Sequence, residues 1–171
     1  MISPRLTLVL GGARSGKSGY AERLIAASAP PWIYVATAQA LDSEMTERIA
    51  RHRAHRGANW QTLEAPHDAA GAIGHAPPDA ALLLDCLTLW LTNRMLAEAD
   101  IAQDTAALEA ALARRRTTTV LVSNEVGCGI VPDNALARRF ADLQGRLNQR
   151  IAARADRVVL VVAGLPLTLK G

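Results

Sequence analysis

Short apolar runs alternate along the chain with stretches whose apolar residues recur at helical spacing. The length of the runs suits strands that are buried on both faces of a sheet. They predict strands over residues 6–10, 32–36, 60–63, 80–84, 118–122 and 157–162, the last of these being the final strand. The helical spacing predicts helices over residues 18–28, 42–56, 67–74, 87–97, 103–116 and 135–155.

The repeated order of strand, helix and strand indicates the fold class. Parallel strands joined by right-handed crossover helices produce this order. A chain of 171 residues is long enough to bury one such sheet beneath helices on both faces. The sequence contains no internal repeat, linker or low-complexity tract. We therefore predict an α/β fold with a mostly parallel sheet, in a single domain that spans residues 1–171.

The composition limits the binding partners and the cellular location that we expect for this protein. The net charge of +3 is modest, and six aromatic residues are too few for a base-stacking platform, so we expect no nucleic-acid partner. Cys86 and Cys128 lack zinc-ligand spacing and are expected to be reduced thiols. No apolar run approaches the roughly 20 residues of a membrane span, and no signal-peptide pattern is present. We expect a cytoplasmic protein without a membrane span.

The first predicted strand leads directly into Gly11-Gly12-Ala13-Arg14-Ser15-Gly16-Lys17-Ser18. This segment matches the Walker A pattern, and a strand before it and a helix after it are the context that the pattern requires. Glycines let backbone N–H groups surround phosphates. Lys17 would reach the β- and γ-phosphate oxygens, and the Ser18 hydroxyl would bind Mg²⁺. The segment predicts a site for ATP or GTP with Mg²⁺, against the alternative of a glycine-rich turn with a chance Lys-Ser pair.

Two further predicted strands end in carboxylates, Asp85 and Glu125. Ligands of open α/β sheets bind beyond the carboxyl ends of the strands, so both side chains should lie at the edge that carries the phosphate loop. One carboxylate could hold Mg²⁺ while the other orients a nucleophile, and the sequence leaves open which does which. The alternative for Asp85 is a cap on the helix that begins near Leu87.

Residues 48–56 hold four arginines and two histidines. On a helix, Arg48, His52, His55 and Arg56 share one face, where the charges repel one another unless an anion lies between them. A triphosphate is such an anion, and a neutral imidazole among arginines could attack a phosphate to form a phosphoramidate. A solvated basic face is the alternative. A metal pair of His52 and His55 would lack an evident third ligand.

Further short motifs follow in order. They are Tyr34-Val35-Ala36-Thr37-Ala38-Gln39, Asp42-Ser43-Glu44-Met45, Arg48-Ile49-x-x-His52-Arg53, Leu84-Asp85-Cys86-Leu87-Thr88, Ser123-Asn124-Glu125-Val126-Gly127-x-Gly129-Ile130-Val131-Pro132, Gly145-Arg146-Leu147-Asn148-Gln149-Arg150 and Val161-Val162-Ala163-Gly164. With the phosphate loop, this series resembles the bifunctional adenosylcobinamide kinase and adenosylcobinamide-phosphate guanylyltransferase family of cobalamin synthesis. The resemblance covers nearly the whole chain, and the combination is far more specific than Walker A alone.

The resemblance implies a RecA-like P-loop fold and two reactions. A nucleoside triphosphate, ATP or GTP, phosphorylates the aminopropanol arm of adenosylcobinamide. GTP then transfers GMP to that phosphate through a guanylylated histidine, and the matching residue is His52. His55 is the nearby competitor, but His52 alone lies in the Arg-Ile-x-x-His frame. A homo-oligomer is also implied, since a trimer is known in the family. Beyond the phosphate loop, the implied nucleotide contacts are Thr37, Ala38, Gln39, Arg53, Ala54, His55, Arg56, Glu64 and Asp85.

The candidate catalytic residues are therefore His52, Lys17, Asp85 and Glu125, and the candidate Mg²⁺ ligands are Ser18 and Asp85. Two other functions stay open. One is a P-loop small-molecule kinase that uses Lys17 and Mg²⁺ without a covalent step. The other is a nucleotide-binding module with no enzymatic role.

Overall fold

The computed structural model describes residues 4–40 and 42–171, except for the side chains of residues 44, 48, 51–53 and 55. The described residues form one seven-stranded sheet in the order β3-β2-β4-β5-β1-β6-β7. Neighbouring strands are parallel except for β6 and β7. The strands are β1 (Leu6–Gly11), β2 (Trp32–Ala36), β3 (Trp60–Glu64), β4 (Ala81–Asp85), β5 (Thr119–Asn124), β6 (Arg157–Val162) and β7 (Leu165–Lys170).

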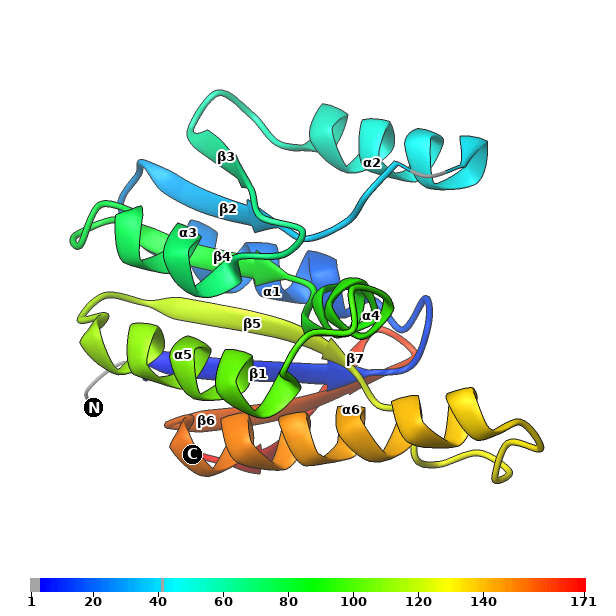
Figure 1. The fold of residues 1–171 in the computed structure, drawn as a ribbon. Helices are drawn as coiled ribbons and strands as arrows, with labels where there is room; N and C mark the ends of the chain where they lie inside the picture. Colours follow the sequence, from blue (N-terminus) through cyan, green and yellow to red (C-terminus); the bar gives the residue numbers. More distant parts are fainter. Residues whose placement is uncertain (1–3, 41) are drawn as a thin grey trace.

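Helices cover both faces of this sheet. Figure 1 shows α3, α5 and α6 in front of the strands and α1 behind them, while α2 lies beside β3 at the top of the view. This arrangement confirms the predicted α/β fold with helices on both faces. The helices are α1 (Lys17–Ala26), α2 (Ser43–His55), α3 (Ala69–His75), α4 (Leu87–Leu96), α5 (Ile101–Arg114) and α6 (Ala135–Arg154).

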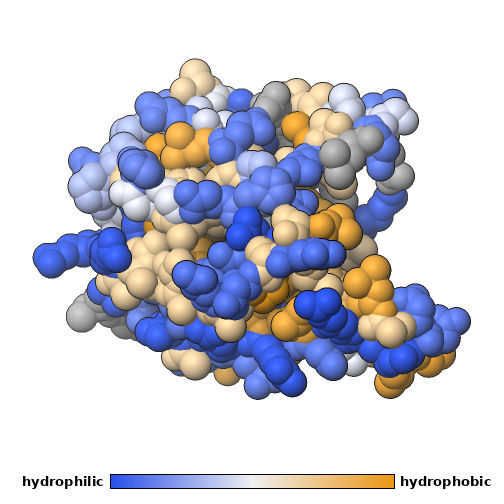
Figure 2. Space-filling model, viewed as in Figure 1, coloured by the Kyte–Doolittle hydropathy of each residue, from blue (hydrophilic) through white to orange (hydrophobic). Residues whose placement is uncertain are grey.

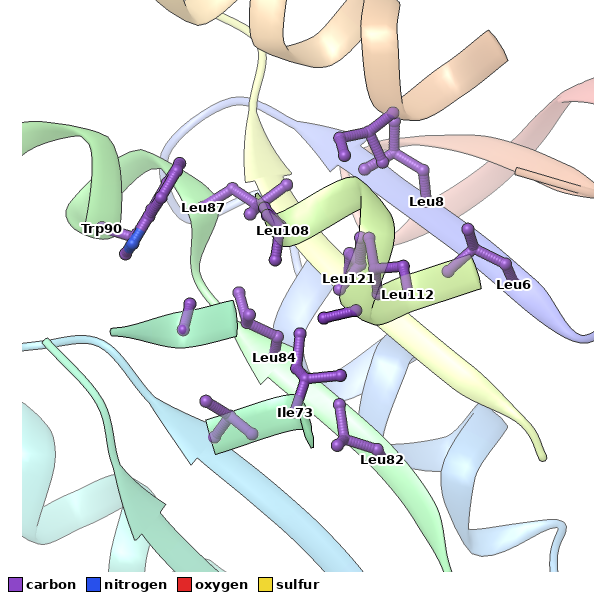
Figure 3. Packing of buried hydrophobic residues seen from close by; sticks show 14 of the residues in the cluster. Leu6, Leu8, Ile73, Leu82, Leu84, Leu87, Trp90, Leu108, Leu112 and Leu121 are labelled. Atoms are coloured by element: carbon purple, nitrogen blue, oxygen red, sulfur yellow. The ribbon is translucent and has the colours of Figure 1, made fainter. Parts of the chain in front are cut away.

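Two apolar clusters lie on opposite faces of the sheet because successive strand residues point to opposite sides. In β4, Leu82 and Leu84 join the larger cluster with Trp90 of α4 (Figure 3). Leu83, between them, joins the smaller cluster with Ile25 of α1. All four aliphatic side chains are fully buried. A strand covered on both sides reads as a continuous apolar run, which is why β4 could be predicted from the sequence.

The carboxyl ends of β1, β4 and β5 meet at one edge of the sheet, the right-hand edge in Figure 1. β5 lies between the other two, with Gly11 of β1 paired to Asn124 and Asp85 of β4 paired to Val122. Neighbouring strands are about 4.8 Å apart, so the strand that leads into the phosphate loop and the strand that ends at Asp85 are separated by about 10 Å. A ligand at this edge can therefore reach both strands.

Residues 157–162 form a strand, β6, as predicted. The prediction that it is the final strand was wrong, because β7 follows and pairs antiparallel with β6. The two strands are joined by Ala163 and Gly164, whose φ angles of 53° and 80° form a two-residue turn. An Asn-Gly or Asp-Gly pair would have signalled this hairpin, and Ala-Gly does not. Pro166 also argues against a strand, but β7 lies at the edge, where proline is tolerated.

Helix α5 differs from the predicted helix over residues 103–116 at both ends. α5 begins two residues before the predicted start because Asp100 caps it, accepting hydrogen bonds from the N–H groups of Ala102 and Gln103. It ends at Arg114 rather than at the predicted Arg116. Among the described residues, no helix combines the length and the apolar character that crossing a membrane would need.

Candidate active site

The phosphate loop joins the end of β1 to the start of α1. Arg14 and Gly16 both have positive φ angles, 56° and 93°, which turn successive N–H groups inward. Gly16 is the N-cap of α1, and no described side chain caps this helix. The N–H groups of its first turn therefore remain available to an anion, and the helix dipole favours negative charge at the same place. The local geometry is that of a phosphate-binding loop.

Lys17 is the first residue of α1, and its side chain folds back over the loop. Its Nζ donates a hydrogen bond to the carbonyl oxygen of Gly12 at 3.0 Å, and the residue is only 7% exposed. The ammonium group therefore lies beside the loop's own backbone, where a phosphate would bring oxygen acceptors. Ser18, the next residue in the helix, is half-buried.

Hairpin β6–β7 packs against the phosphate loop. An added Cβ on Gly11 would lie 2.6 Å from the carbonyl oxygen of Val161, and one on Gly16 would lie 3.2 Å from the Cα of Gly164. The loop and the hairpin approach each other so closely that only glycine fits at Gly11. Ser15, inside the loop, has a buried hydroxyl without a hydrogen-bond partner among the described residues.

Asp85 closes β4 at the ligand edge, as predicted. The N-cap of α4 is Cys86, and α4 has no side-chain cap, so the alternative of a helix-capping Asp85 is wrong. Its Oδ2 instead accepts a hydrogen bond from the Tyr34 hydroxyl at 3.0 Å. Burial, with the Asp85 carboxylate next in importance, raises the pKa of Tyr34 above its usual range, so the phenol stays protonated and acts as the donor.

A pocket opens beside Asp85 on the face of the sheet that α1 covers. The guanidinium carbon of Arg56 lies 3.4 Å from the centroid of the Tyr34 ring, and its Nη1 donates to Thr62 Oγ1 at 3.4 Å. Apolar walls with a few charged groups suit a planar ligand that has hydrogen-bonding edges. The charged residues that line the pocket are Arg56, Glu64 and Asp85, and the apolar residues include Met45, Ile49 and Leu89.

The segment after β2 is only partly available to a ligand. The Thr37 hydroxyl donates to the carbonyl of Cys86 and accepts from its N–H, both at 2.8 Å, so this side chain is occupied inside the protein. Ala38 lines the pocket. Gln39 Nε2 lies 2.9 Å from His67 Nε2. Of the three predicted contacts here, Ala38 lies at the pocket, and Thr37 can offer a nucleotide little beyond its backbone.

Asn93 is a structural residue of this edge that the sequence analysis missed. Its Nδ2 donates to the carbonyls of Thr37 at 2.8 Å and Pro66 at 2.9 Å, joining the segments that follow β2 and β3. The residue is buried in α4. A lone asparagine in an otherwise apolar helical face was the available signal, because a buried amide needs hydrogen-bond partners.

Glu125 lies next to the phosphate loop, as predicted from its place after β5. Its N–H donates to the carbonyl of Gly11 at 3.1 Å. Its Oε1 accepts from the N–H of Gly127 at 2.6 Å, so one carboxylate oxygen holds the following turn. Behind it, the buried amide of Asn148 donates to the carbonyl of Asn124 at 3.0 Å and accepts from the Ser123 hydroxyl at 2.7 Å. This network fixes the end of β5.

The basic segment forms helix α2, which begins after Asp42, whose Oδ1 accepts from the N–H of Met45 at 2.7 Å. The helix contains His52, Arg53 and His55. Their side chains lie outside the described part of the structure, as do those of Arg48 and Arg51. Ala54 is exposed. The roles assigned to these residues remain predictions.

Both cysteines are free thiols, as predicted, with Cys86 buried and Cys128 exposed. Burial, with a smaller contribution from the Asp85 carboxylate, raises the pKa of the Cys86 thiol to about 11. Cys86 is therefore protonated at neutral pH and acts as a small apolar side chain.

Known proteins match almost the whole chain. The sequence model of the family described as "Cobinamide kinase / cobinamide phosphate guanyltransferase" matches residues 7–169. The bifunctional adenosylcobalamin biosynthesis protein CobP of Pseudomonas aeruginosa is 51% identical over 167 residues, covering 96% of each chain. The bifunctional adenosylcobalamin biosynthesis protein CobU of Salmonella typhimurium is 47% identical over 181 residues, covering 96% of this chain and 99% of the relative.

A solved structure, described as a prototypical ATPase from the type III secretion system of pathogenic bacteria, shares the fold. Its TM-score is 0.55 at 10% sequence identity, and the match covers 96% of this chain and 56% of the ATPase. At this identity the likeness is one of fold alone. It confirms the prediction of a RecA-like P-loop fold.

Proposed function

The chain belongs to the cobinamide kinase / cobinamide phosphate guanyltransferase family, and from this premise we propose that it catalyses both reactions of that name. It phosphorylates adenosylcobinamide with ATP or GTP, and it then transfers GMP from GTP to adenosylcobinamide phosphate. The observation that carries the proposal is the family match over residues 7–169, with a phosphate loop and two strand-end carboxylates at one edge.

The kinase step relies on the phosphate loop. The oxygen of the substrate hydroxyl attacks the γ-phosphorus, and the bond from that phosphorus to the bridging oxygen of the β-phosphate breaks. The hydroxyl proton is released to water, and the nucleoside diphosphate leaves. The Lys17 ammonium and the N–H groups at the start of α1 stabilise the negative charge that spreads over the phosphate oxygens. Glu125, whose N–H donates to the carbonyl of Gly11, is assigned to orient the attacking hydroxyl.

The donor set suits Mg²⁺. Ser18 and Asp85 offer hard oxygen ligands, and no three His, Cys, Asp or Glu side chains cluster among the described residues. Mg²⁺ typically takes one or two protein oxygens and completes its shell with water and phosphate oxygens. When bound, the ion would neutralise charge on the phosphates. The buried Ser15 hydroxyl, which lacks a described partner, would gain an acceptor from a bound phosphate.

The guanylyl step proceeds through His52. One imidazole nitrogen attacks the α-phosphorus of GTP, the bond to the β-phosphate oxygen breaks, and pyrophosphate leaves. The phosphate of the phosphorylated substrate then attacks the same phosphorus, the N–P bond breaks, and the imidazole is restored. The arginines on either side of His52 in the sequence supply positive charge for the departing pyrophosphate.

The spacing of α2 supports His52 over His55. Met45 and Ile49 line the pocket and are one turn apart in the helix. At 3.6 residues per turn, position 52 falls on the face of Met45 and Ile49, whereas position 55 lies further round the helix. The pocket beside Asp85 would then hold the guanine nucleotide within reach of α2.

A homo-oligomer, with the trimer that the resemblance implies, is part of the proposal. Large hydrophobic side chains reach the surface at Ile130 and Val131, which are 97% and 75% exposed, and at Leu165 of β7, which is 72% exposed. Figure 2 shows hydrophobic surface at the right-hand end of the molecule, where the loop before α6 lies. Exposed surface of this kind supports association between copies. Analytical ultracentrifugation gives the number of subunits.

The test is direct assay of both reactions. Purified protein is incubated with adenosylcobinamide, Mg²⁺ and either ATP or GTP, and the corrinoid products are identified by mass spectrometry. The proposal predicts adenosylcobinamide phosphate with either nucleotide that serves as donor, and adenosylcobinamide-GDP only with GTP. If incubation with GTP gives adenosylcobinamide phosphate but no adenosylcobinamide-GDP, the protein is a simple kinase. If neither product forms with either nucleotide, the protein is a nucleotide-binding module.

A further inference from the structure

Tyr34 has no part in the chemistry described so far, yet it contacts both charged sides of the pocket. It lies in the middle of β2, is 5% exposed, and faces the side of the sheet that α1 covers. Its hydroxyl donates to Asp85 and its ring lies under Arg56. The ring of Trp60 packs edge-on against it, with centroids 6.1 Å apart. Trp60 therefore holds the Tyr34 ring in place between the two charged groups.

The hydroxyl contact fixes the orientation of Asp85. In this bond the Tyr34 hydroxyl is the donor and a carboxylate oxygen of Asp85 is the acceptor. A bond to Oδ2 at 3.0 Å restricts rotation of the carboxylate, while its remaining lone pairs can still accept or bind a cation. Loss of a group that orients a metal ligand in this way typically lowers metal affinity or activity by about tenfold or more.

The ring contact fixes Arg56 on the other side. The guanidinium carbon is 3.4 Å from the ring centroid, close enough for the planar cation to stack on the ring. Thr62 accepts a further bond from Arg56 at 3.4 Å. Arg56 follows the end of α2, and Asp85 ends β4, so the two groups come from elements that are distant in sequence. Tyr34 is in contact with both.

We propose that Tyr34 is a positioning residue that couples the metal side of the site to its nucleotide side. Its hydroxyl holds Asp85 for the cation, and its ring holds Arg56 for the nucleotide. The proposal rests on the function given above, in which Asp85 serves Mg²⁺ and Arg56 contacts the guanine nucleotide. Because coupling between two ligands is reciprocal, bound GDP should tighten cation binding and the cation should tighten GDP binding.

Tyr34→Phe separates the two contacts, because it removes the hydroxyl and keeps the ring. Mn²⁺ takes the place of Mg²⁺, and its affinity in the presence of GDP is measured by electron paramagnetic resonance. We expect Mn²⁺ to bind about tenfold more weakly to the variant. GDP affinity in EDTA, measured by calorimetry, should stay within about twofold of wild type. Tyr20→Phe, at the chain's other tyrosine, should change neither value.

A double-mutant cycle distinguishes positioning from a general structural role. If Tyr34 acts through Asp85, Tyr34→Phe should weaken Mn²⁺ binding in the wild-type background and have no further effect in an Asp85→Asn background. Equal effects in the two backgrounds would overturn the proposal. So would unchanged Mn²⁺ affinity in Tyr34→Phe itself.

Tyr34→Leu tests the ring by removing it as well. GDP affinity in EDTA should fall by about fivefold, since the stacking surface for Arg56 is lost. Tyr34→Met serves the same purpose if circular dichroism shows that the leucine variant is not folded. Unchanged GDP affinity in the folded variant would contradict the ring's role. If the wild-type protein makes neither corrinoid product, the proposed function is contradicted. If it makes both products but the Tyr34 variants bind Mn²⁺ and GDP as the wild type does, only the role of Tyr34 is contradicted.

Discussion

The N–H of Gly164 donates a hydrogen bond to the carbonyl oxygen of Ser15 at 2.8 Å. This bond joins the turn of hairpin β6–β7 to the phosphate loop, almost 150 residues earlier in the chain. The same turn lies against Gly16, and Val161 lies against Gly11. Hairpin β6–β7 thus braces the back of the loop that is proposed to bind phosphate, and changes in the hairpin should affect nucleotide binding.

Gly164→Ala should destabilise the protein by about 1 kcal/mol, because the residue has a φ of 80° that a side chain disfavours. We also expect weaker GDP binding, since strain in the turn displaces the loop that it braces. Urea denaturation and calorimetry measure the two effects. Gly129→Ala is the matched control, because an added Cβ meets no atom within 4 Å at either glycine, and only Gly164 of the two has a positive φ. Equal behaviour of the two variants would contradict the bracing role.

Lys17→Ala should abolish both reactions while the fold remains intact. The ammonium group lies over the loop, where its charge would stabilise the transferred phosphoryl group by several kcal/mol. The corrinoid assay measures the rates, and circular dichroism monitors the fold. Near-normal rates in a folded variant would exclude this segment as the catalytic phosphate loop.

Asp85→Asn should weaken Mg²⁺-dependent activity more than it weakens folding. Asparagine keeps the shape and an acceptor for the Tyr34 hydroxyl, but loses the charge that attracts the cation. The rate is measured as a function of Mg²⁺ concentration, and excess Mg²⁺ should restore part of it. An unchanged Mg²⁺ dependence would remove Asp85 from the metal site.

Glu109→Gln should destabilise the fold in a pH-dependent manner. Glu109 on α5 accepts hydrogen bonds from Arg150 and Arg154 of α6 at 2.8 to 3.1 Å. The bond from Arg150 is the main cause of a folded-state pKa below the ordinary value of 4.5. This stabilisation is therefore present above pH 4.5 and is lost as the pH falls through the folded-state pKa.

At pH 7 we expect the Glu109→Gln variant to lose about 1 kcal/mol of unfolding free energy, a value kept small because both arginines are partly exposed. The difference from wild type should shrink below pH 4.5 in urea denaturation. Glu47→Gln, at an exposed position of α2, should show little effect at either pH. A difference that persists unchanged in acid would show that packing, not charge, is involved.

The strand-end carboxylates and the phosphate loop could be predicted because each depends on local sequence. A buried parallel strand is a continuous apolar run, and a polar residue at its end must lie at the ligand edge. Asp85 and Glu125 were placed in this way. The fold class followed from the same alternation of strands and helices.

Contacts between distant segments could not be predicted. The hydrogen bond from Tyr34 to Asp85 forms because β2 and β4 are neighbours in the sheet. The sequences of the two strands do not indicate that they are neighbours. The same holds for Asn93, whose partners lie in two different loops. Strand β7 was missed because its turn lacks the usual residues and the strand contains a proline.

The most direct test of the account is the covalent intermediate. Protein incubated with GTP and Mg²⁺ is denatured, and the GMP adduct is located by mass spectrometry. We expect an adduct on His52 that is stable to base and labile to acid, as a phosphoramidate is. His52→Ala should lose the adduct and the guanylyl product while keeping kinase activity, and His55→Ala should keep all three. A GMP label on His55, or one that persists in His52→Ala, would contradict the account.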